Sequence, residues 1–210
     1  MGIKEDVIAK LLTLFILDKK ERHIKRKLIK LDLQTKKYGR QVLKNAQSVG
    51  KGFWCGGYSR VSSRTILANN VSFTGGMRIQ GHGLCKIGQH FHAGNDCLIL
   101  TENHNYDKGK TIPYDEIFIC KDVIIDDFVW LGSRVIVLPG SHIGEGAIIQ
   151  AGAVVHGDIP PCAIAGGNPA KVFKYRDVEH FKKLKKEGKF YTNEVKFANL
   201  EENSNIYIYE

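Results

Sequence analysis

The stretch from Ile119 to Val155 reads ICKDVIIDDFVWLGSRVIVLPGSHIGEGAIIQAGAVV and places a branched aliphatic residue at every sixth position. This row consists of Ile119, Ile125, Leu131, Val137, Ile143, Ile149 and Val155. A second row, four residues later, holds aliphatic or small residues: Val123, Val129, Val135, Ser141, Ala147, Ala153 and Ile159. A period of six fits neither the helical repeat of about 3.6 residues nor the alternation of an isolated strand.

Very short strands joined by tight corners explain this period, because the same inward position recurs after each corner. Three strands and three corners make a coil of about 18 residues, and stacked coils bury a continuous aliphatic column. Glycine follows the aliphatic residue in Leu131-Gly132 and Ile143-Gly144, which suits a backbone that turns sharply. The rows therefore predict a β-solenoid with a triangular cross-section.

The repeats begin at Val49, slip by two residues at Gly81–Gly83 and stop after Val155, where two prolines would remove ladder donors. A polar insertion interrupts them and is expected to leave the solenoid as a loop. The predicted domains are a helical basic arm at 1–44, the β-helix at 45–170 with its loop at 100–118, and a C-terminal segment at 171–210. That last segment is expected to hold a short helix at 178–191 and a polar tail.

The net charge of +9 is concentrated in the N-terminal arm. Residues 1–44 contain 13 Lys and Arg but five Asp and Glu, whereas residues 45–170 have a net charge of −1. Two interpretations of the arm stay open: a cap on the open end of the solenoid, or a weak peripheral contact with an anionic membrane. A neutral body without a basic stripe argues against nucleic-acid binding.

Five cysteines without a C-x-x-C pair indicate neither a disulfide framework nor a zinc knuckle, and we expect all five to be reduced in a cytoplasmic protein. The apolar run from Val7 to Leu17 is too short to span a bilayer. No small-residue cleavage site follows it, so a signal peptide is not predicted.

His104 is the strongest catalytic candidate. It lies in the polar insertion, in Asn103-His104-Asn105, and has no role in the aliphatic rows. A neutral imidazole, with an ordinary pKa of about 6.5, can take a proton from a hydroxyl at neutral pH. An ordinary loop histidine is the alternative. Asp107 or Asp115 could orient the second ring nitrogen, although loop carboxylates are commonly solvated.

The period-six rows, the histidine in an extruded loop and the segment Asn168-Pro169-Ala170-Lys171 together resemble the hexapeptide-repeat acyltransferases, over residues 49–174. The resemblance is to the galactoside, maltose, nodulation and serine acetyltransferases. It implies a left-handed parallel β-helix, a homotrimer with active sites at the subunit seams, and direct acetyl transfer from acetyl-CoA to a sugar hydroxyl without a metal. It also implies that His104 is the general base.

The same resemblance implies the contacts to acetyl-CoA. The Ser133 backbone amide would stabilise the oxyanion, and Trp130 would either flank the thioester or lie at the trimer seam. The implied acetyl-CoA contacts are Ser133, Ala151, His156, Gly157, Lys171 and Lys174. The two lysines match basic residues near the nucleotide phosphates, with a solvated surface as the alternative.

The acceptor side departs from the galactoside pattern. Thr74 stands where those enzymes have an asparagine, and their acceptor-binding aspartate falls near His82. The candidate acceptor residues are Thr74, His82, Asp107 and Asp115. A weaker resemblance, carried by Phe73-Thr74-Gly75-Gly76 with the long loop, is to enzymes that modify sugars of a surface polysaccharide or its precursor.

Three alternative functions stay open at this level. The same base could support N-acetylation of an amino sugar. The γ-class carbonic anhydrases use the same prism and hold zinc with three histidines from neighbouring subunits. Four histidines within 23 residues (His82, His90, His92 and His104) make a zinc enzyme of this class an alternative, although their spacing differs from that of the histidines in the carbonic anhydrases. A trimeric scaffold without catalysis is the third alternative.

Overall fold

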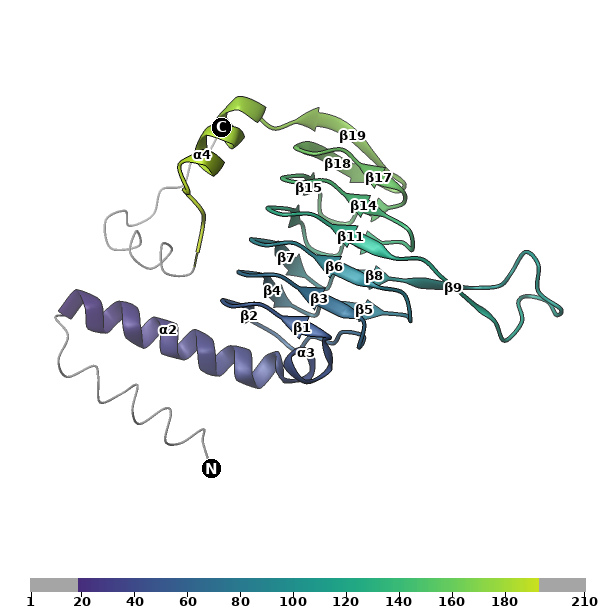
Figure 1. Cartoon of the computed structure of the whole chain (residues 1–210), viewed down its shortest axis with the longest axis horizontal. Helices are drawn as coiled ribbons and strands as arrows, with labels where there is room; N and C mark the ends of the chain where they lie inside the picture. The colour runs from purple at the N-terminus through teal and green to yellow at the C-terminus, as the bar shows by residue number, and fades with distance from the viewer. Residues whose placement is uncertain (1–18, 193–210) are drawn as a thin grey trace.

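The computed structural model describes residues 19–192, which fold as a parallel β-solenoid of stacked coils (Figure 1). The predicted left-handed parallel β-helix with a short C-terminal helix is confirmed. Predictions for the first part of the N-terminal arm, and for the tail that contains Ile206-Tyr207-Ile208-Tyr209, lie outside the described residues.

Three sheets form the sides of the prism. Face A contains β1 (Ser48–Val49), β3 (Thr65–Leu67), β6 (Cys85–Ile87), β11 (Val123–Ile125), β14 (His142–Ile143) and β17 (Asp158–Ile159). Face B contains β2 (Trp54–Cys55), β4 (Ser72–Gly75), β7 (His92–Asn95), β12 (Trp130–Leu131), β15 (Ile148–Ile149) and β18 (Ala163–Gly167), followed by the antiparallel β19 (Ala170–Tyr175). Face C contains β5 (Arg78–Gln80), β8 (Leu98–Leu100), β13 (Ile136–Val137) and β16 (Val154–Val155). Each coil therefore passes from face A through B to C.

The aliphatic row supplies the inward position of each strand. Ile125 pairs in parallel with Ile87 on one side and with Ile143 on the other, and only 1% of its surface is exposed. The second row is buried as well, and its polar member Ser141 donates its hydroxyl hydrogen to the carbonyl of Leu138 at 2.7 Å. The two rows thus form the continuous core, because each coil buries the aliphatic side chains of its neighbours.

Two details of the predicted rows are wrong. Ile119 lies on the hairpin described below and is 42% exposed, so the buried part of the stretch begins at Val123. The predicted burial of Ile159 is confirmed, but the solenoid does not stop there, because β17 and β18 add a further partial coil that also buries Ala165. Pro160–Pro161 fall at the corner between these two strands, where a proline removes no ladder hydrogen bond.

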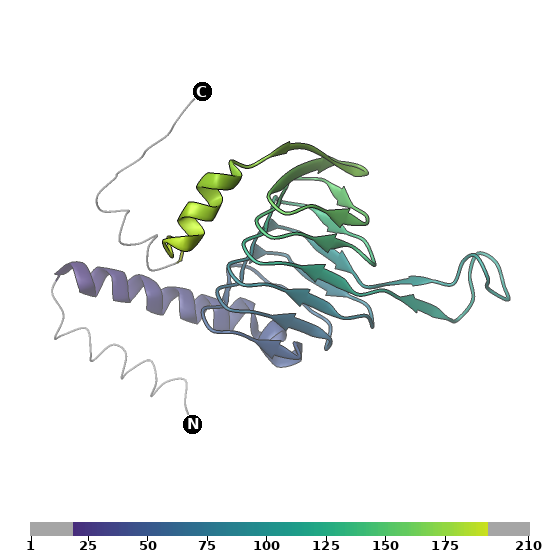
Figure 2. The same cartoon turned by 45° about the horizontal axis from the view of Figure 1, so that its top comes forward.

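The insertion forms a β-hairpin. β9 (Glu102–His104) and β10 (Phe118–Cys120) pair antiparallel, and the hairpin projects sideways from the prism (Figures 1 and 2). Its tip is organised by the buried carboxylate of Asp115. This carboxylate accepts hydrogen bonds from the Asn105 side chain at 3.0 Å, the Lys110 amide at 3.1 Å and the Ile117 amide at 3.0 Å.

Helices flank the two ends of the solenoid. At the first coil, α2 (Lys19–Tyr38) and α3 (Arg40–Asn45) cover the open core. Thr35 accepts a hydrogen bond from the Cys55 amide at 3.1 Å, and Val42 is fully buried. The described part of the arm therefore caps the solenoid. At the other end, α4 (Val178–Lys186) follows β19 and is shorter than predicted.

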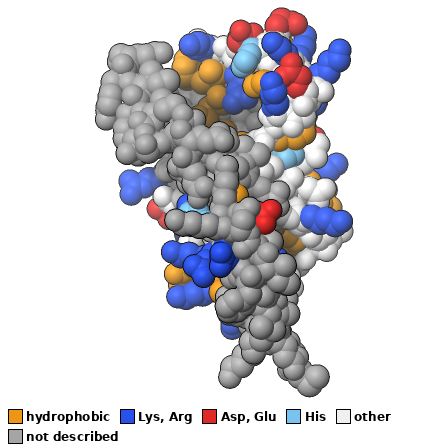
Figure 3. Space-filling model, turned by 90° about the vertical axis from the view of Figure 1, so that its left-hand side faces the viewer, with side chains coloured by type: hydrophobic (Ala, Val, Ile, Leu, Met, Phe, Trp, Pro, Cys, Tyr) orange, Lys and Arg blue, Asp and Glu red, His pale blue; other side chains and the backbone are white. Residues whose placement is uncertain are grey.

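The face that carries α2 and α4 displays many Lys and Arg side chains on its described part (Figure 3). Within residues 19–192, no helix combines the length and the apolar composition that a membrane crossing requires. All five cysteines carry free thiols, and four of them are buried. Burial raises the pKa of the Cys85 thiol to about 12, so this side chain is a core residue without reactive thiolate character.

Candidate active site

Eight of the twelve predicted site residues lie at two corners of the prism. The hairpin corner, between faces C and A, comprises residues 81–84, 101–122, 138–141 and 156–157. The serine corner, between faces B and C, comprises residues 56–59, 76–77, 96–97, 132–135 and 150–153. Both corners run the length of the solenoid, because each coil contributes one turn to each of them.

His104 lies in a cavity of about 340 Å³ at the hairpin corner. The lining residues are Asn103, His104, Asn105, Tyr106, Asp107, Lys108, Ile119, Lys121, Leu138, Pro139 and His156. The imidazole is half-buried and stacks on the ring of Tyr114, with ring centroids 3.8 Å apart and planes 13° apart. Phe118 approaches the same imidazole at 4.9 Å. The hairpin therefore packs the imidazole against two aromatic rings, beside open space.

The two loop aspartates have different environments. Asp107 is exposed and lines the cavity of His104. Asp115 is buried, which acts to raise its pKa, but hydrogen bonds from the backbone amides of Ile117 and Lys110 and from Asn105 outweigh burial and leave the pKa lowered. Among the residues that the structure describes, neither carboxylate is hydrogen-bonded to His104. Asp115 organises the hairpin tip.

His82 and the pair His156-Gly157 also belong to the hairpin corner. The His82 ring nitrogen Nδ1 lies 2.6 Å from the Glu102 carboxylate at the base of the hairpin, and the histidine side chain is 78% exposed. His156 lines the same cavity as His104. A residue predicted to contact acetyl-CoA and the predicted base thus share one cavity in a single chain.

The serine corner contains Ser133 and Ala151 in consecutive coils. The Ser133 hydroxyl oxygen accepts a hydrogen bond from the Asn95 amide at 3.1 Å. The Ser133 amide itself donates to no acceptor within residues 19–192. A Cβ on Gly132 would lie 2.5 Å from the Ala151 nitrogen, so the two coils approach too closely there for any other residue. The result is a partly exposed strip of small residues that includes an amide without an acceptor in the described part of the chain.

The remaining predicted residues lie on face B or beyond it. Trp130 points outward from β12, is 50% exposed and pairs in register with His92 and Ile148. Thr74, on β4 just before the serine corner, donates its hydroxyl hydrogen to the Ala93 carbonyl at 2.8 Å. Lys171 and Lys174 are exposed on β19 at the C-terminal end.

Face C separates the two groups of predicted residues. Its crossing from the serine corner to the hairpin corner takes about six residues, or about 20 Å at about 3.3 Å per residue. His104 and Ser133 therefore cannot contact the same small group within one chain. The structure brings together His104, Asp107 and His156, and it brings together Ser133 and Ala151, but it keeps these two sets apart.

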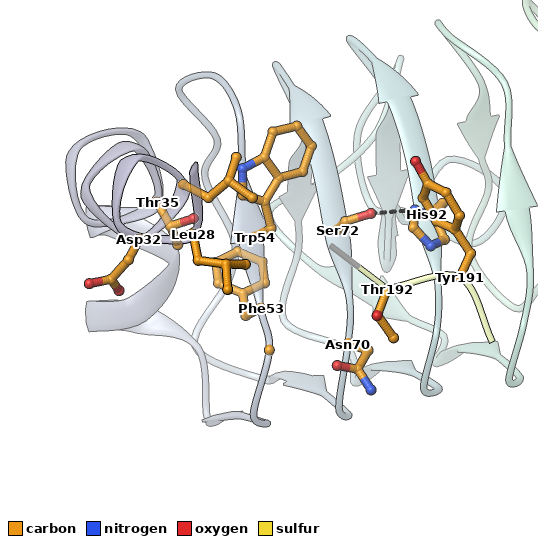
Figure 4. A pocket seen from close by; sticks show the side chains of 12 residues that line it. Leu28, Asp32, Thr35, Phe53, Trp54, Asn70, Ser72, His92, Tyr191 and Thr192 are labelled. Carbon is orange, nitrogen blue, oxygen red and sulfur yellow. Dashed lines mark hydrogen bonds between the residues drawn. The ribbon is translucent and has the colours of Figure 1, made fainter. Parts of the chain in front are cut away.

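Sequence reasoning missed several residues around these sites. Tyr114 stacks on His104 but lies ten positions away in an irregular loop, where no period predicts contact. Another cavity of about 360 Å³ lies between α2 and face B and contains none of the residues predicted to act in acetyl transfer (Figure 4). In it the Ser72 hydroxyl oxygen lies 2.6 Å from His92 Nδ1. Ser72 and His92 are one coil apart in the sequence, and this spacing could have predicted their contact.

The four clustered histidines of the carbonic anhydrase alternative occupy different places. His82 and His104 lie at the hairpin corner, whereas His90 and His92 lie at and just before β7. Burial lowers the pKa of His90, and the negative charge of Asp127 partly offsets the effect. In the described part of the chain, no three His, Cys, Asp or Glu side chains form a group that could hold a metal ion.

Comparison with known proteins identifies the repeats. Residues 122–157 match the family model described as bacterial transferase hexapeptide (six repeats). A Schizosaccharomyces pombe protein provisionally named an acetyltransferase is 64% identical over 89 residues, which are 42% of each chain. The chloramphenicol acetyltransferase of Klebsiella aerogenes is 34% identical over 105 residues, covering 44% of this chain and 49% of that protein. The chain thus spans about half the length, or less, of these relatives.

One solved structure has a similar architecture. AntD of Bacillus cereus, an N-acyltransferase solved with dTDP and 3-hydroxybutyryl-CoA, superimposes with a TM-score of 0.50 at 16% identity, over 68% of this chain and 79% of that one. At this identity the likeness concerns the fold alone. Residues 122–157 therefore match the hexapeptide repeats of bacterial transferases, and the chain is similar over part of its length to proteins named as acetyltransferases.

Proposed function

We propose that the chain is an acetyl-CoA-dependent O-acetyltransferase that acts on a saccharide hydroxyl, with His104 as its general base. The observation that carries the proposal is the presence of two half-sites at neighbouring corners of one solenoid. The hairpin corner holds an imidazole in a cavity, and the serine corner holds an available amide beside small residues. Acyl transfer needs both groups: a base for the attacking hydroxyl and a donor for the oxyanion.

A second copy of the chain would complete each site. Between the two corners, the outward side chains of face C form an apolar stripe of Leu98, Ile136 and Val154, which lie in register and are partly exposed. A threefold axis beside face C would bury this stripe and bring the hairpin corner of one copy to the serine corner of the next. The proposed assembly is a homotrimer with three equivalent sites at its seams.

The chemistry assigned to the chain's own residues is proton transfer and charge stabilisation. When bound, acetyl-CoA supplies the acetyl group as a thioester. His104 takes the proton of the acceptor hydroxyl as its oxygen bonds to the acetyl carbon, and it returns that proton to the sulfur as the carbon–sulfur bond breaks. The Ser133 amide donates to the carbonyl oxygen, where negative charge develops. The Tyr114 ring keeps the imidazole oriented.

The residues along the serine corner and β19 fit a long anionic thioester. A Cβ at Gly152 would meet no atom within 4 Å, so the strip beside Ala151 is open to a narrow ligand chain. Lys171 and Lys174 are exposed and have no ion-pair partner within residues 19–192. These cations would attract the phosphates of the nucleotide end.

The acceptor proposal follows the resemblance described above. We propose a sugar of a surface polysaccharide or its precursor, modified in the cytoplasm. Peripheral membrane contact through the basic arm stays a prediction. N-acetylation of an amino sugar is an outcome that the acceptor panel below would reveal.

The test is release of CoA thiol from acetyl-CoA across a panel of sugars and amino sugars. We expect His104→Ala to lower kcat by about 10²–10⁴-fold without loss of fold. His142→Ala is the matched control, because His142 lies outside both half-sites and its Nε2 pairs with the Asp126 carboxylate at 3.0 Å. Retention of most activity by His104→Ala would show that another residue is the base.

A further inference from the structure

A basic cavity lies at the N-terminal end of the serine corner. Its volume is about 1030 Å³, it is open to solvent, and it is lined by residues of α2, α3 and the first three coils. Its charged residues are Lys37, Arg40, Lys44, Arg60 and Arg78, against the single carboxylate of Asp96. Within residues 19–192, none of these five cations belongs to an ion pair. The cavity therefore carries a concentrated positive charge that the described fold does not neutralise.

Two of these cations are neighbours on face C. Arg60 and Arg78 form a parallel bridge between adjacent coils, and both side chains point outward and are exposed. Like charges at directly opposed positions destabilise a sheet, so this pair has a cost in the absence of an anion. The next outward position in the row is Leu98, so the charge is confined to the first two coils.

The cavity is adjacent to the proposed reaction site. Asp96, in its wall, lies one coil from Ser133, because the Arg134 amide donates to the Asn95 carbonyl at 2.7 Å. Successive coils are about 4.8 Å apart, which puts Arg78 about 10 Å from Ser133 along the corner. A saccharide whose hydroxyl reacts at Ser133 would extend its remaining groups into the basic cavity.

We infer that the acceptor is an anionic saccharide, which carries a phosphate, a diphosphate or a carboxylate group about one sugar ring away from the hydroxyl that is acetylated. This inference rests on the proposed function. The guanidinium forks of Arg60 and Arg78 match the paired oxygens of such groups. Tyr58, 71% exposed and held edge-on against Tyr38 at 4.9 Å, offers an apolar surface to a sugar ring.

The first arm of the test measures binding without chemistry. Pyrophosphate is titrated calorimetrically into the full chain, into the double variant Arg60→Gln/Arg78→Gln, and into Lys44→Gln as a milder change on α3. We expect the double variant to bind at least about tenfold more weakly. Arg64→Gln is the matched control, because Arg64 is exposed but does not line the cavity. Absence of binding to the unaltered chain, or unchanged binding to the double variant, would refute an anion site.

The second arm measures kcat/KM with methyl galactoside, galactose 1-phosphate and galacturonic acid, so that phosphate and carboxylate are distinguished. We expect at least about a tenfold preference for one charged sugar, which the double variant loses while its rate with the neutral sugar is kept. No charge preference in the unaltered chain, or an equal loss for all three sugars, would overturn the inference. If no sugar accepts acetyl at all, the proposed function fails, and the pyrophosphate titration still decides whether the cavity binds anions.

Discussion

Two inactive variants of this chain should restore each other's activity if each active site is shared between copies. His104→Ala removes the base at the hairpin corner. Ala151→Trp fills the serine corner with an indole ring. Ala151 is exposed, and its backbone is not in the left-handed region, so the larger side chain extends into solvent in a single chain. Both variants are therefore expected to fold, and purification on two tags selects the oligomers in which they assemble.

The size of the recovery follows from the geometry. His104 and Ala151 lie on opposite sides of face C, about 20 Å apart, so one chain cannot present both to the same carbonyl. In a trimer of the proposed arrangement, a seam is intact when one copy supplies His104 and its neighbour supplies Ala151. If the two variants mix at random in equal amounts, about a quarter of all seams should be intact, and about a quarter of the unaltered activity should return. A trimer that contains both variants has one intact seam, so it should have about a third of the activity of the unaltered trimer.

The assay is co-expression of the two variants with different affinity tags, purification on both tags in sequence, and thiol release from acetyl-CoA with the best acceptor. Each variant alone serves as the baseline. Doubly tagged oligomers that are folded but no more active than either variant would show that His104 and Ala151 act within one chain. That result would refute the shared site.

Three further predictions test the hairpin and the core. Tyr114→Ala should lower kcat about two- to thirteenfold, because the stack on His104 is worth about 0.5–1.5 kcal/mol. Tyr114→Phe keeps an aromatic ring and should keep the rate. Equal losses of kcat in both variants would exclude a role for the stack. The pKa of Asp115 is lowered in the folded chain, so its stabilisation of the hairpin is complete above the ordinary carboxyl pKa and is lost as pH falls through the lowered value. Amide hydrogen exchange of residues 102–120 against pH should follow that direction, and Asp115→Asn should remove the dependence. Ile125→Ala should lower the free energy of unfolding by about 2–5 kcal/mol, and Ile119→Ala by about 1 kcal/mol at most, as measured by denaturant unfolding. Similar losses in the two variants would contradict the assignment of Ile119 to the exposed hairpin.

The solenoid was predictable because its signal is local and repeated. Every coil uses the same inward positions, so the period of six identifies buried residues such as Ile125 and Ile143 without any knowledge of long-range contacts. Ile119 shares the period by coincidence, since it lies in a hairpin whose path is set by its own pairing with β9. The final partial coil was missed because Pro160–Pro161 read as a stop, although a corner tolerates them.

The residue types of the candidate site could also be read from the sequence, namely a loop histidine, small residues at corners and two lysines near the end of the repeats. The sequence does not show which of these residues lie at the same corner of the prism. Residues six positions apart lie on different faces of the prism, whereas residues one whole coil apart are neighbours in space. An insertion or a slip in the repeats therefore changes which side chains are in contact. The stack of Tyr114 on His104, the distance across face C and the basic cavity beneath α2 all arise from contacts between remote segments, which only the folded chain defines.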